Sequence, residues 1–218
     1  IVREPKAFMM DEPLGALDAE FREHMAEELR ALHDRMGATT VYVTHDQLEA
    51  MQMGDKIVVM NHGSVEQFGV PQDIYDWPTT MFVADFIGSP PMNFLHLKES
   101  VNAGDSTIAL NGQIFEIPIQ LQGCEGDVVF GVRPEHIFFD PNSQYRGDII
   151  AIEYLGTTQI VTLQTQNGTL KSRIPSAEPA AEGESVGLAF NPRVITLFDK
   201  KTGVALLSEG NKGVLGDG

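Results

Sequence analysis

Two kinds of hydrophobic pattern meet at a Pro/Gly-rich stretch, GSPPMN, at residues 88–93. Before this stretch, short apolar runs alternate with helical apolar stripes, which is the pattern of an α/β sheet with parallel strands. After it, short β-rich runs follow one another between frequent turns, and helical periodicity is nearly absent. The sequence therefore predicts an α/β region followed by an all-β region built as a small barrel or sandwich.

The first region contains a strand–helix–strand pattern. Residues 7–10 are a short apolar run, which predicts a buried strand. Asp18 is placed to cap the next helix, and Gly37 is placed to end it. Residues 39–45, TTVYVTH, are rich in β-branched residues and predict a second strand. The apolar stripe of the intervening helix comprises Phe21, Met25, Leu29, Leu32 and Met36.

Further signals for helix ends and turns follow before the Pro/Gly-rich stretch. Asp46 followed by Glu49 resembles a capping box that opens a short helix ending at Gly54. Asn61-His62-Gly63 lies between two apolar runs and predicts a hairpin. Pro71 suits the first turn of another helix.

Composition excludes several classes of function. The chain has 31 acidic residues against 15 Lys and Arg, a formal net charge of −16. This balance argues against nucleic-acid binding and against adsorption to an anionic membrane. No apolar run approaches the roughly 18 residues of a transmembrane helix. Cys124 is the only cysteine, so no intrachain disulfide can form, which fits a reducing compartment.

Two adjacent carboxylates, Asp11 and Glu12, end the first apolar run and precede Pro13. The carboxyl ends of parallel strands are where α/β folds place ligands. An aspartate there can help to hold Mg²⁺, and a glutamate can orient a water or accept its proton. Pro13 favours an extended Glu12, which would direct the two side chains apart. The alternative is a polar strand end without chemistry, because short motifs match by chance.

The second predicted strand ends in Thr44-His45-Asp46. A parallel neighbour would bring His45 to the same sheet edge as Asp11 and Glu12. A neutral imidazole there can hydrogen-bond a γ-phosphate or an attacking water near neutral pH. Taken alone, His45 is better explained as a cap or a structural histidine, but the pair of strand ends is more specific.

Residues 1–94, from EPKAFMMDEPLGALDAEFR through TTVYVTHDQLEAMQMGDKIVVM to FIGSPPMNF, resemble the second half of an ABC-transporter ATP-binding subunit. The similarity is to the sugar and glycerol-phosphate importer branch, the maltose-transporter ATPase type. The later segments GVRPEHI, GDIIAIEYLGTTQIVTL and FNPRVITLFDKKTGVAL are similar to the OB-type regulatory domain of that branch.

The resemblance implies a role for four residues. Asp11 matches the Walker B aspartate that partners Mg²⁺ through water, and Glu12 matches the catalytic glutamate. His45 matches the switch histidine that senses the γ-phosphate. Asp18 matches the D-loop aspartate that couples the two ATP sites of a subunit dimer. The D-loop reads Gly15-Ala16 where Ser-Asn is commonest, so the serine hydroxyl is missing, but Leu17 and Asp18 are kept and the implied role of the D-loop is retained.

The resemblance also implies the fold class and the domain limits. We expect a partial P-loop NTPase (RecA-like) α/β sheet in residues 1–87 and a linker at 88–94. An OB-type (TOBE-like) all-β regulatory domain should follow at 95–209, with a disordered tail at 210–218. Within the regulatory domain, the aromatics of HIFFD are expected in the core. Arg133 and Glu135 are expected to form a structural turn pair, and His136 has no spaced partners for a metal site.

The motif G-x-x-x-x-G-K-[ST] does not occur, since the chain contains no Gly-Lys pair, and the LSGGQ-type signature is also absent. The simplest explanation is truncation of a longer subunit, and the alternative is a natural regulatory protein. We therefore expect that this chain neither binds nor hydrolyses ATP by itself. We also expect uncovered apolar surface on residues 1–85.

The implied activity of the full-length subunit is ATP hydrolysis, with Mg²⁺, that drives import of a sugar or similar solute. Its implied partners are a second ATPase subunit, membrane permease subunits and, indirectly, a periplasmic or extracellular solute-binding protein. Its location would be the cytoplasmic face of the cell membrane. The alternative is a regulatory, dimerising or ligand-sensing β module. A repair or translation factor is disfavoured by the acidic charge and the β-rich region.

Overall fold

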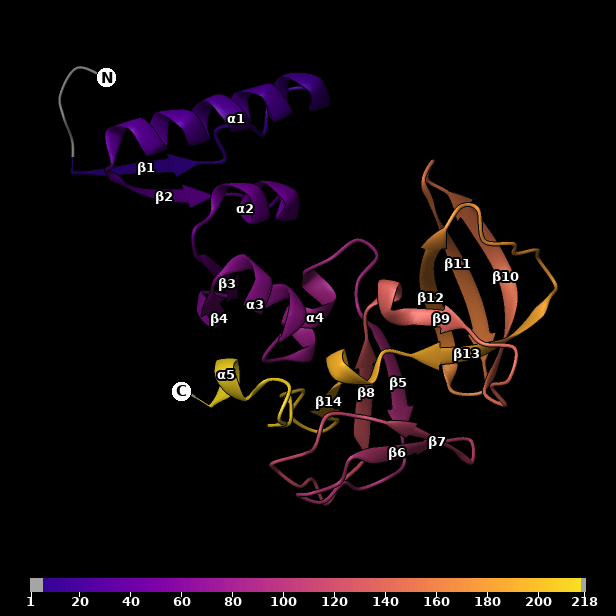
Figure 1. Cartoon of the computed structure of the whole chain (residues 1–218). Coiled ribbons are helices and arrows are strands. Elements are labelled where there is room, and N and C mark those ends of the chain that lie inside the picture. The colour runs from indigo at the N-terminus through magenta and orange to yellow at the C-terminus, as the bar shows by residue number, and fades with distance from the viewer. Residues whose placement is uncertain (1–5, 217–218) are drawn as a thin grey trace. The chain divides into compact units, whose positions relative to one another are not determined.

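The computed structural model of the chain describes residues 6–216, which divide into two compact units at the boundary between residues 72 and 73. Figure 1 draws the first unit in indigo and purple and the second from purple through magenta and orange to yellow. The first five positions of the predicted ATP-binding segment and the last two of the predicted tail lie outside the described residues.

The first unit opens with a parallel strand pair. β1 (Ala7–Asp11) and β2 (Thr39–Val43) pair in register, from Ala7 opposite Thr39 to Asp11 opposite Val43. α1 (Ala19–Met36) is the crossover between them. The predicted strand–helix–strand order is confirmed for these elements.

The strand β1 is not buried, contrary to the prediction from its apolar run. Phe8 and Met10 are half-buried, but Met9 is 85% exposed. On β2, Val41 and Val43 share the exposed face of Met9 and are about half exposed. The reason is that, among the described residues, one face of this two-stranded sheet lacks a covering layer. The expectation of uncovered apolar surface in this part of the chain is confirmed.

The helix ends follow the sequence signals in part. Asp18 caps α1 by accepting a hydrogen bond from the Phe21 amide at 2.9 Å, and Gly37 ends the helix with a left-handed φ of 60°. Asp46 caps α2 (Gln47–Met53), which ends at Gly54. The returning half of the expected capping box is absent, because the Glu49 side chain is buried elsewhere. In the apolar stripe of α1, Phe21 is exposed and the remaining members are partly buried.

The hairpin and the following helix start are as predicted. β3 (Ile57–Asn61) and β4 (Ser64–Gly69) pair antiparallel, with Asn61 opposite Ser64. His62 and Gly63 form the two-residue turn with φ of 46° and 84°, the positive values that such a turn requires. α3 (Pro71–Asp76) begins at the proline.

The second unit is almost entirely β. β14, β8 and β5 form one antiparallel sheet, β12, β11, β10, β13 and β9 form another, and β6 pairs with β7. The bounds of these elements are β5 Asn93–Leu97, β6 Thr107–Leu110, β7 Gln113–Glu116, β8 Val128–Val132, β9 Ile137–Phe139, β10 Arg146–Tyr154, β11 Thr158–Thr165, β12 Gly168–Pro175, β13 Ser185–Phe190 and β14 Thr196–Asp199. Short helical elements are α4 Met81–Phe86, η1 Pro134–His136, η2 Pro192–Val194 and α5 Lys212–Leu215. The succession of short strands and turns expected after the Pro/Gly-rich stretch is therefore observed.

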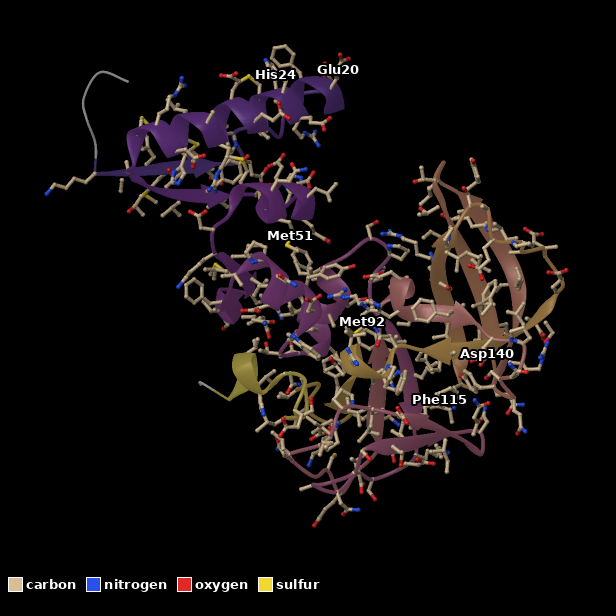
Figure 2. All side chains as sticks on the ribbon, viewed as in Figure 1. Glu20, His24, Met51, Met92, Phe115 and Asp140 are labelled. Atoms are coloured by element: carbon tan, nitrogen blue, oxygen red, sulfur yellow. The ribbon has the colours of Figure 1, made fainter. Side chains whose placement is uncertain are left out.

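The core of the second unit lies between these sheets. Val128, Phe130 and Val132 of β8 point into a cluster that also contains Phe115, labelled in Figure 2, and residues of the five-stranded sheet. The opposite face of β8 is buried as well, because Val129 packs with Ala84 of α4. Gly131 permits this double burial, since a Cβ there would lie 2.6 Å from the Phe198 ring.

The Asn93 side chain joins the three-stranded and the five-stranded sheet of this unit. The Asn93 amide donates to the Lys171 carbonyl at 2.9 Å and to the Val132 carbonyl at 3.2 Å. Its oxygen accepts from the Lys171 amide at 2.7 Å. Asn93 therefore takes the place of a strand neighbour between β5 and β12.

The compact units divide earlier than the linker expected at 88–94. Ala84 of α4 and Met92 belong to a cluster with Val129 and Phe198, so the helix before the Pro/Gly-rich stretch packs with the β-rich unit. β5 also begins inside the expected linker, at Asn93.

Of two smaller expectations, the first is correct for one of its two residues and the second is wrong. Phe138 of the HIFFD segment is 48% exposed, because it points away from the core that Ile137 enters, while Phe139 packs against that core. The tail expected to be disordered is ordered as far as residue 216. Asn211 is buried, donates to the Leu206 carbonyl at 2.9 Å and accepts from the Ser208 amide, so its side chain fixes the turn before α5.

Candidate functional site

The strand ends of β1 and β2 bring two of the predicted site residues into contact. The Glu12 amide donates to the Val43 carbonyl at 2.8 Å, which extends the parallel ladder by one residue. Beyond it, His45 Nδ1 lies 3.1 Å from Glu12 Oε1. Both side chains are open to solvent, with 75% of the histidine and 52% of the glutamate exposed. A carboxylate and an imidazole at this distance can share a proton and together hold a water.

The backbone of Glu12 departs from the extended form that Pro13 was expected to impose. Its φ is 44°, in the left-handed region that costs a non-glycine residue about 1–2 kcal/mol. Two hydrogen bonds hold this conformation: the Glu12 amide bonds Val43, and the Glu12 carbonyl accepts from the Gly15 amide at 3.2 Å. The residue with this strained backbone is thus one of the predicted site residues.

Asp11 and Asp18 have other surroundings. Asp11 ends β1 opposite Val43 and is exposed, on the same open face as Met9. Asp18 is exposed and caps α1. Among residues 6–216, no three His, Cys, Asp or Glu side chains are grouped so that they could hold a metal ion. The phosphate-binding loop is also missing from the sequence. For these two reasons, the residues present do not by themselves form a complete site for Mg²⁺ and ATP.

The sequence pattern did not single out a buried group next to His45. The Glu49 carboxylate accepts from the Tyr42 hydroxyl at 3.0 Å and from the Thr44 hydroxyl at 2.8 Å. Arg22 of α1 approaches the same carboxylate. Burial, followed by the bond to Glu49, raises the pKa of the Tyr42 hydroxyl. The available signal was the spacing of a Glu three residues after a helix cap, which capping explained equally well.

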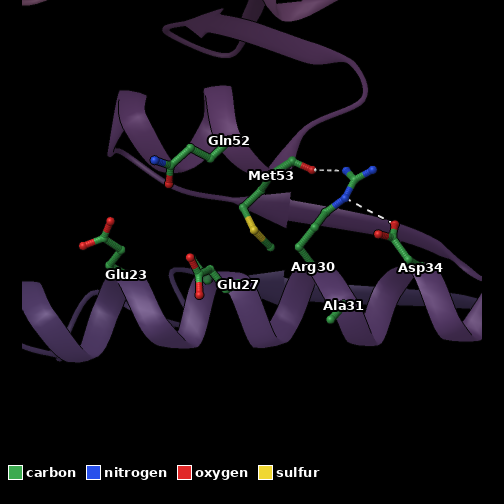
Figure 3. A pocket seen from close by; sticks show the side chains of 8 residues that line it. Glu23, Glu27, Arg30, Ala31, Asp34, Gln52 and Met53 are labelled. Atoms are coloured by element: carbon green, nitrogen blue, oxygen red, sulfur yellow. Dashed lines mark hydrogen bonds and ion pairs between the residues drawn. The ribbon is translucent and has the colours of Figure 1, made fainter.

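A groove of about 400 Å³ lies between α1 and α2, away from the strand ends. Figure 3 shows its side chains: Arg30 donates to the Met53 carbonyl at 2.9 Å and pairs with Asp34 at 3.3 Å. Glu23 and Glu27 complete an acidic lining. Because Arg30 is already bonded, the groove offers no free cation for a phosphate.

The second unit contains a buried arginine. The Arg133 guanidinium is 2% exposed and donates to the carbonyls of Tyr75, Ala84 and Ile87. It stacks on the Tyr75 ring with 4.1 Å between the guanidinium carbon and the ring centre. Burial lowers the pKa of Arg133. These contacts are structural, as expected. The expected pairing with Glu135 is not observed, because the guanidinium bonds backbone carbonyls instead.

Glu135 instead binds the same tyrosine. The Tyr75 hydroxyl donates to Glu135 at 2.6 Å. Burial and this hydrogen bond raise the pKa of Tyr75 to about 12. Tyr75 is thus held by Arg133 at its ring and by Glu135 at its hydroxyl.

No helix within residues 6–216 combines the length and the apolar character needed to cross a bilayer.

The β-rich unit matches two domain families. The MalK OB fold domain matches residues 88–137, and the TOBE domain matches residues 130–198. The chain is a homologue of ATP-binding proteins of ABC importers for sugars and glycerol phosphate, and its second unit carries their OB-type, all-β domains.

Three relatives illustrate this similarity. The trehalose/maltose import ATP-binding protein MalK of Thermococcus litoralis is 42% identical, over 94% of this chain and 59% of the relative. The sn-glycerol-3-phosphate import ATP-binding protein UgpC of a Jannaschia species is 40% identical, over 93% and 57%. The uncharacterized ABC transporter ATP-binding protein YurJ of Bacillus subtilis is 41% identical, over 93% and 59%. The chain thus spans less than three fifths of the length of these relatives.

Proposed function

We propose that this chain is part of an ATP-binding subunit that energises import of a sugar or similar solute. Its first unit would form one side of the ATP site, and its second unit would be the regulatory domain. The contact between Glu12 and His45 carries this proposal, because it joins the two residues that the resemblance assigns to hydrolysis. Homology to import ATP-binding proteins along nearly the whole chain supports it.

In this proposal the four residues have separate roles. Glu12 orients a water and accepts its proton, and His45 holds the Glu12 carboxylate and senses the phosphate end of the nucleotide. Asp11 is the carboxylate for Mg²⁺ through water, and Asp18 couples two copies of the subunit. Because the sequence lacks the G-x-x-x-x-G-K-[ST] motif, this chain alone is expected neither to bind nor to hydrolyse ATP.

The partners and location follow from the same assignment. A second ATPase subunit would complete a homodimer, and membrane permease subunits would dock on it, with a solute-binding protein acting indirectly. The subunit would lie at the cytoplasmic face of the cell membrane, without a nucleic-acid partner.

The first test is calorimetric titration of the 218-residue chain with Mg·ATP. No binding heat is expected up to millimolar nucleotide. Micromolar affinity would contradict the proposal that the phosphate-binding loop must come from residues outside this chain.

The second test restores the missing motif. The segment of the Thermococcus litoralis relative that this chain does not match would be fused ahead of residue 1, and ATPase activity would be measured. Glu12→Gln should lower kcat by about a hundredfold or more, as loss of a proton acceptor does. Glu20→Gln, the same change at an exposed position of α1 labelled in Figure 2, is the control and should leave kcat unchanged. Equal activity of the two variants would refute the role of Glu12.

A second candidate function is a regulatory or dimerising module formed by the β-rich unit. Its own buried core and the two domain matches favour this function for residues 73–218. Light scattering on that segment would reveal a dimer, and titration with an oxyanion would reveal a ligand sensor. A monomer that binds no oxyanion would leave this candidate without support.

A further inference from the structure

We infer that Glu49 and Arg22 are positioning residues that hold the segment carrying His45 and the turn before α1 in one fixed arrangement. This inference rests on the proposed function, because it explains how His45 is kept beside Glu12. It concerns residues that neither touch the predicted reacting atoms nor follow from the site motifs.

The first part of the argument is the position of His45. Its side chain is exposed and bonds Glu12, so its place depends mainly on the backbone to either side of it. Thr44 and Asp46 flank it, and the Asp46 amide donates to the Thr44 hydroxyl oxygen at 3.0 Å. The segment is therefore a small turn whose shape depends on the Thr44 side chain.

The Glu49 carboxylate fixes the Thr44 side chain through a hydrogen bond. The carboxylate is 7% exposed, and one oxygen accepts from both Thr44, at 2.8 Å, and Tyr42, at 3.0 Å. Tyr42 lies in β2 and Thr44 follows its last residue. Glu49 thus locks the orientation of Thr44 relative to the strand that the segment leaves.

Arg22 connects the same segment to the turn that precedes α1. Its guanidinium lies 3.5 Å from Asp46 and 3.8 Å from Glu49, and it donates to the Leu17 carbonyl at 2.9 Å. Leu17 directly precedes Asp18, the residue proposed to couple two ATP sites. One side chain therefore links the residue after His45 with the residue before Asp18.

Stability alone gives a poor account of this network. A buried carboxylate must be fully bonded to offset its desolvation. Here the closest Arg22 nitrogen to Glu49, Nε, makes no hydrogen bond, and 3.8 Å is long for a paired charge. An apolar contact between α1 and α2 would meet the packing need without burying a charge. A network that is imperfect for stability yet links two site segments fits a positioning role.

The test uses the fused protein described above, in which ATPase activity can be measured. Glu49→Gln and Arg22→Met should each lower kcat by about tenfold, with KM for ATP changed less than about twofold, because a misplaced His45 affects the reaction more than nucleotide binding. Arg30→Met is the matched control. Arg30 also lies on α1, bonds a carbonyl and pairs with carboxylates, but it does not contact the His45 segment.

The outcomes separate the inference from the proposed function. If Glu12→Gln abolishes activity while Glu49→Gln and Arg22→Met keep the kcat of the Arg30→Met control, the positioning inference is wrong and the proposed function stands. If Glu12→Gln keeps full activity, the proposed function itself fails.

A second measurement does not depend on activity. In the 218-residue chain, amide hydrogen exchange at Asp46 and Leu48 should speed up about tenfold in Glu49→Gln, since both amides are bonded within the segment. Exchange across β8 serves as the internal reference for an intact fold. Unchanged exchange at both amides would overturn the inference whatever the variants do to ATPase activity.

Discussion

In the first unit, β1 and β2 form a two-stranded sheet with one apolar face exposed, and Met9 is its most exposed large hydrophobic residue. In the second unit, β8 lies between two neighbouring strands and is buried on both faces. The two units have similar apolar strands, AFMMD and VVFGV, so the difference lies in what covers them. Covered strands create a core, whereas uncovered strands leave surface that another layer could bury.

The largest expected contrast is in local stability. Backbone amides of β8 should exchange on the order of a thousandfold more slowly than those of β1, because opening β8 requires breaking two ladders and a core. Hydrogen exchange followed by mass spectrometry measures both strands in one sample. Similar protection of β1 and β8 would remove the contrast between the units.

Phe130→Ala should destabilise the second unit by about 3–5 kcal/mol, since the side chain is fully buried in the core. Chemical denaturation monitored by circular dichroism would report the loss. Phe138→Ala is the matched control, because the same atoms are removed from a half-exposed site, and it should cost less than about 1 kcal/mol.

Arg133→Met should cost the second unit about 3 kcal/mol, because three carbonyls lose their buried donor. Arg146→Met is the control, since Arg146 makes its contacts with Ser185 at an exposed site. A variant of Arg133 as stable as that control would show that the guanidinium is replaceable by apolar packing.

The pKa of Tyr75, raised to about 12, predicts a loss of stability in alkali. The folded state keeps the phenol proton that the unfolded state releases near its ordinary pKa of about 10. The contribution is therefore complete below pH 10 and disappears as the pH rises to 12. Because Tyr75 is only partly buried, the loss should be about 1 kcal/mol. Thermal melts from pH 9 to 12 should show a shallower decline in Tyr75→Phe than in the parent chain.

The smallest expected effect is at the exposed sheet of the first unit. Met9→Thr should change the free energy of unfolding by less than about 0.5 kcal/mol, because little surface is buried there. Met10→Thr, at the half-buried neighbouring position, should cost more. A large loss in Met9→Thr would mean that Met9 is covered in solution, for example by a second copy, and ultracentrifugation would reveal that association.

Local patterns predicted much of the fold. Strand positions in the second unit, the Asn61–Ser64 hairpin, and the caps at Asp18 and Gly37 follow from short-range steric and hydrogen-bonding rules, so the residues themselves were sufficient. The burial of β1 was mispredicted, since an apolar run shows what a strand could bury and not whether a partner layer is present.

The candidate site was predictable in its residues and less so in its geometry. The strand ends indicated that Glu12 and His45 would meet, and they do. The left-handed Glu12 was not foreseen, because Pro13 restricts its neighbour only statistically. Arg22 and Glu49 were not foreseen either, because each had a sufficient local explanation as a helix residue.

Asn93 has a consequence for how freely the second unit can vary in sequence. Its amide both donates to and accepts from Lys171, and it also donates to Val132, so a replacement needs a donor and an acceptor at the same reach. Aspartate would place a negative charge against two carbonyl oxygens. Leucine would leave the backbone amide and carbonyl of Lys171 without their Asn93 partner. Leu95, nearby in β5, can exchange with another aliphatic residue of similar volume at small cost. A library of all single substitutions should therefore find position 93 less tolerant than the hydrophobic core around it.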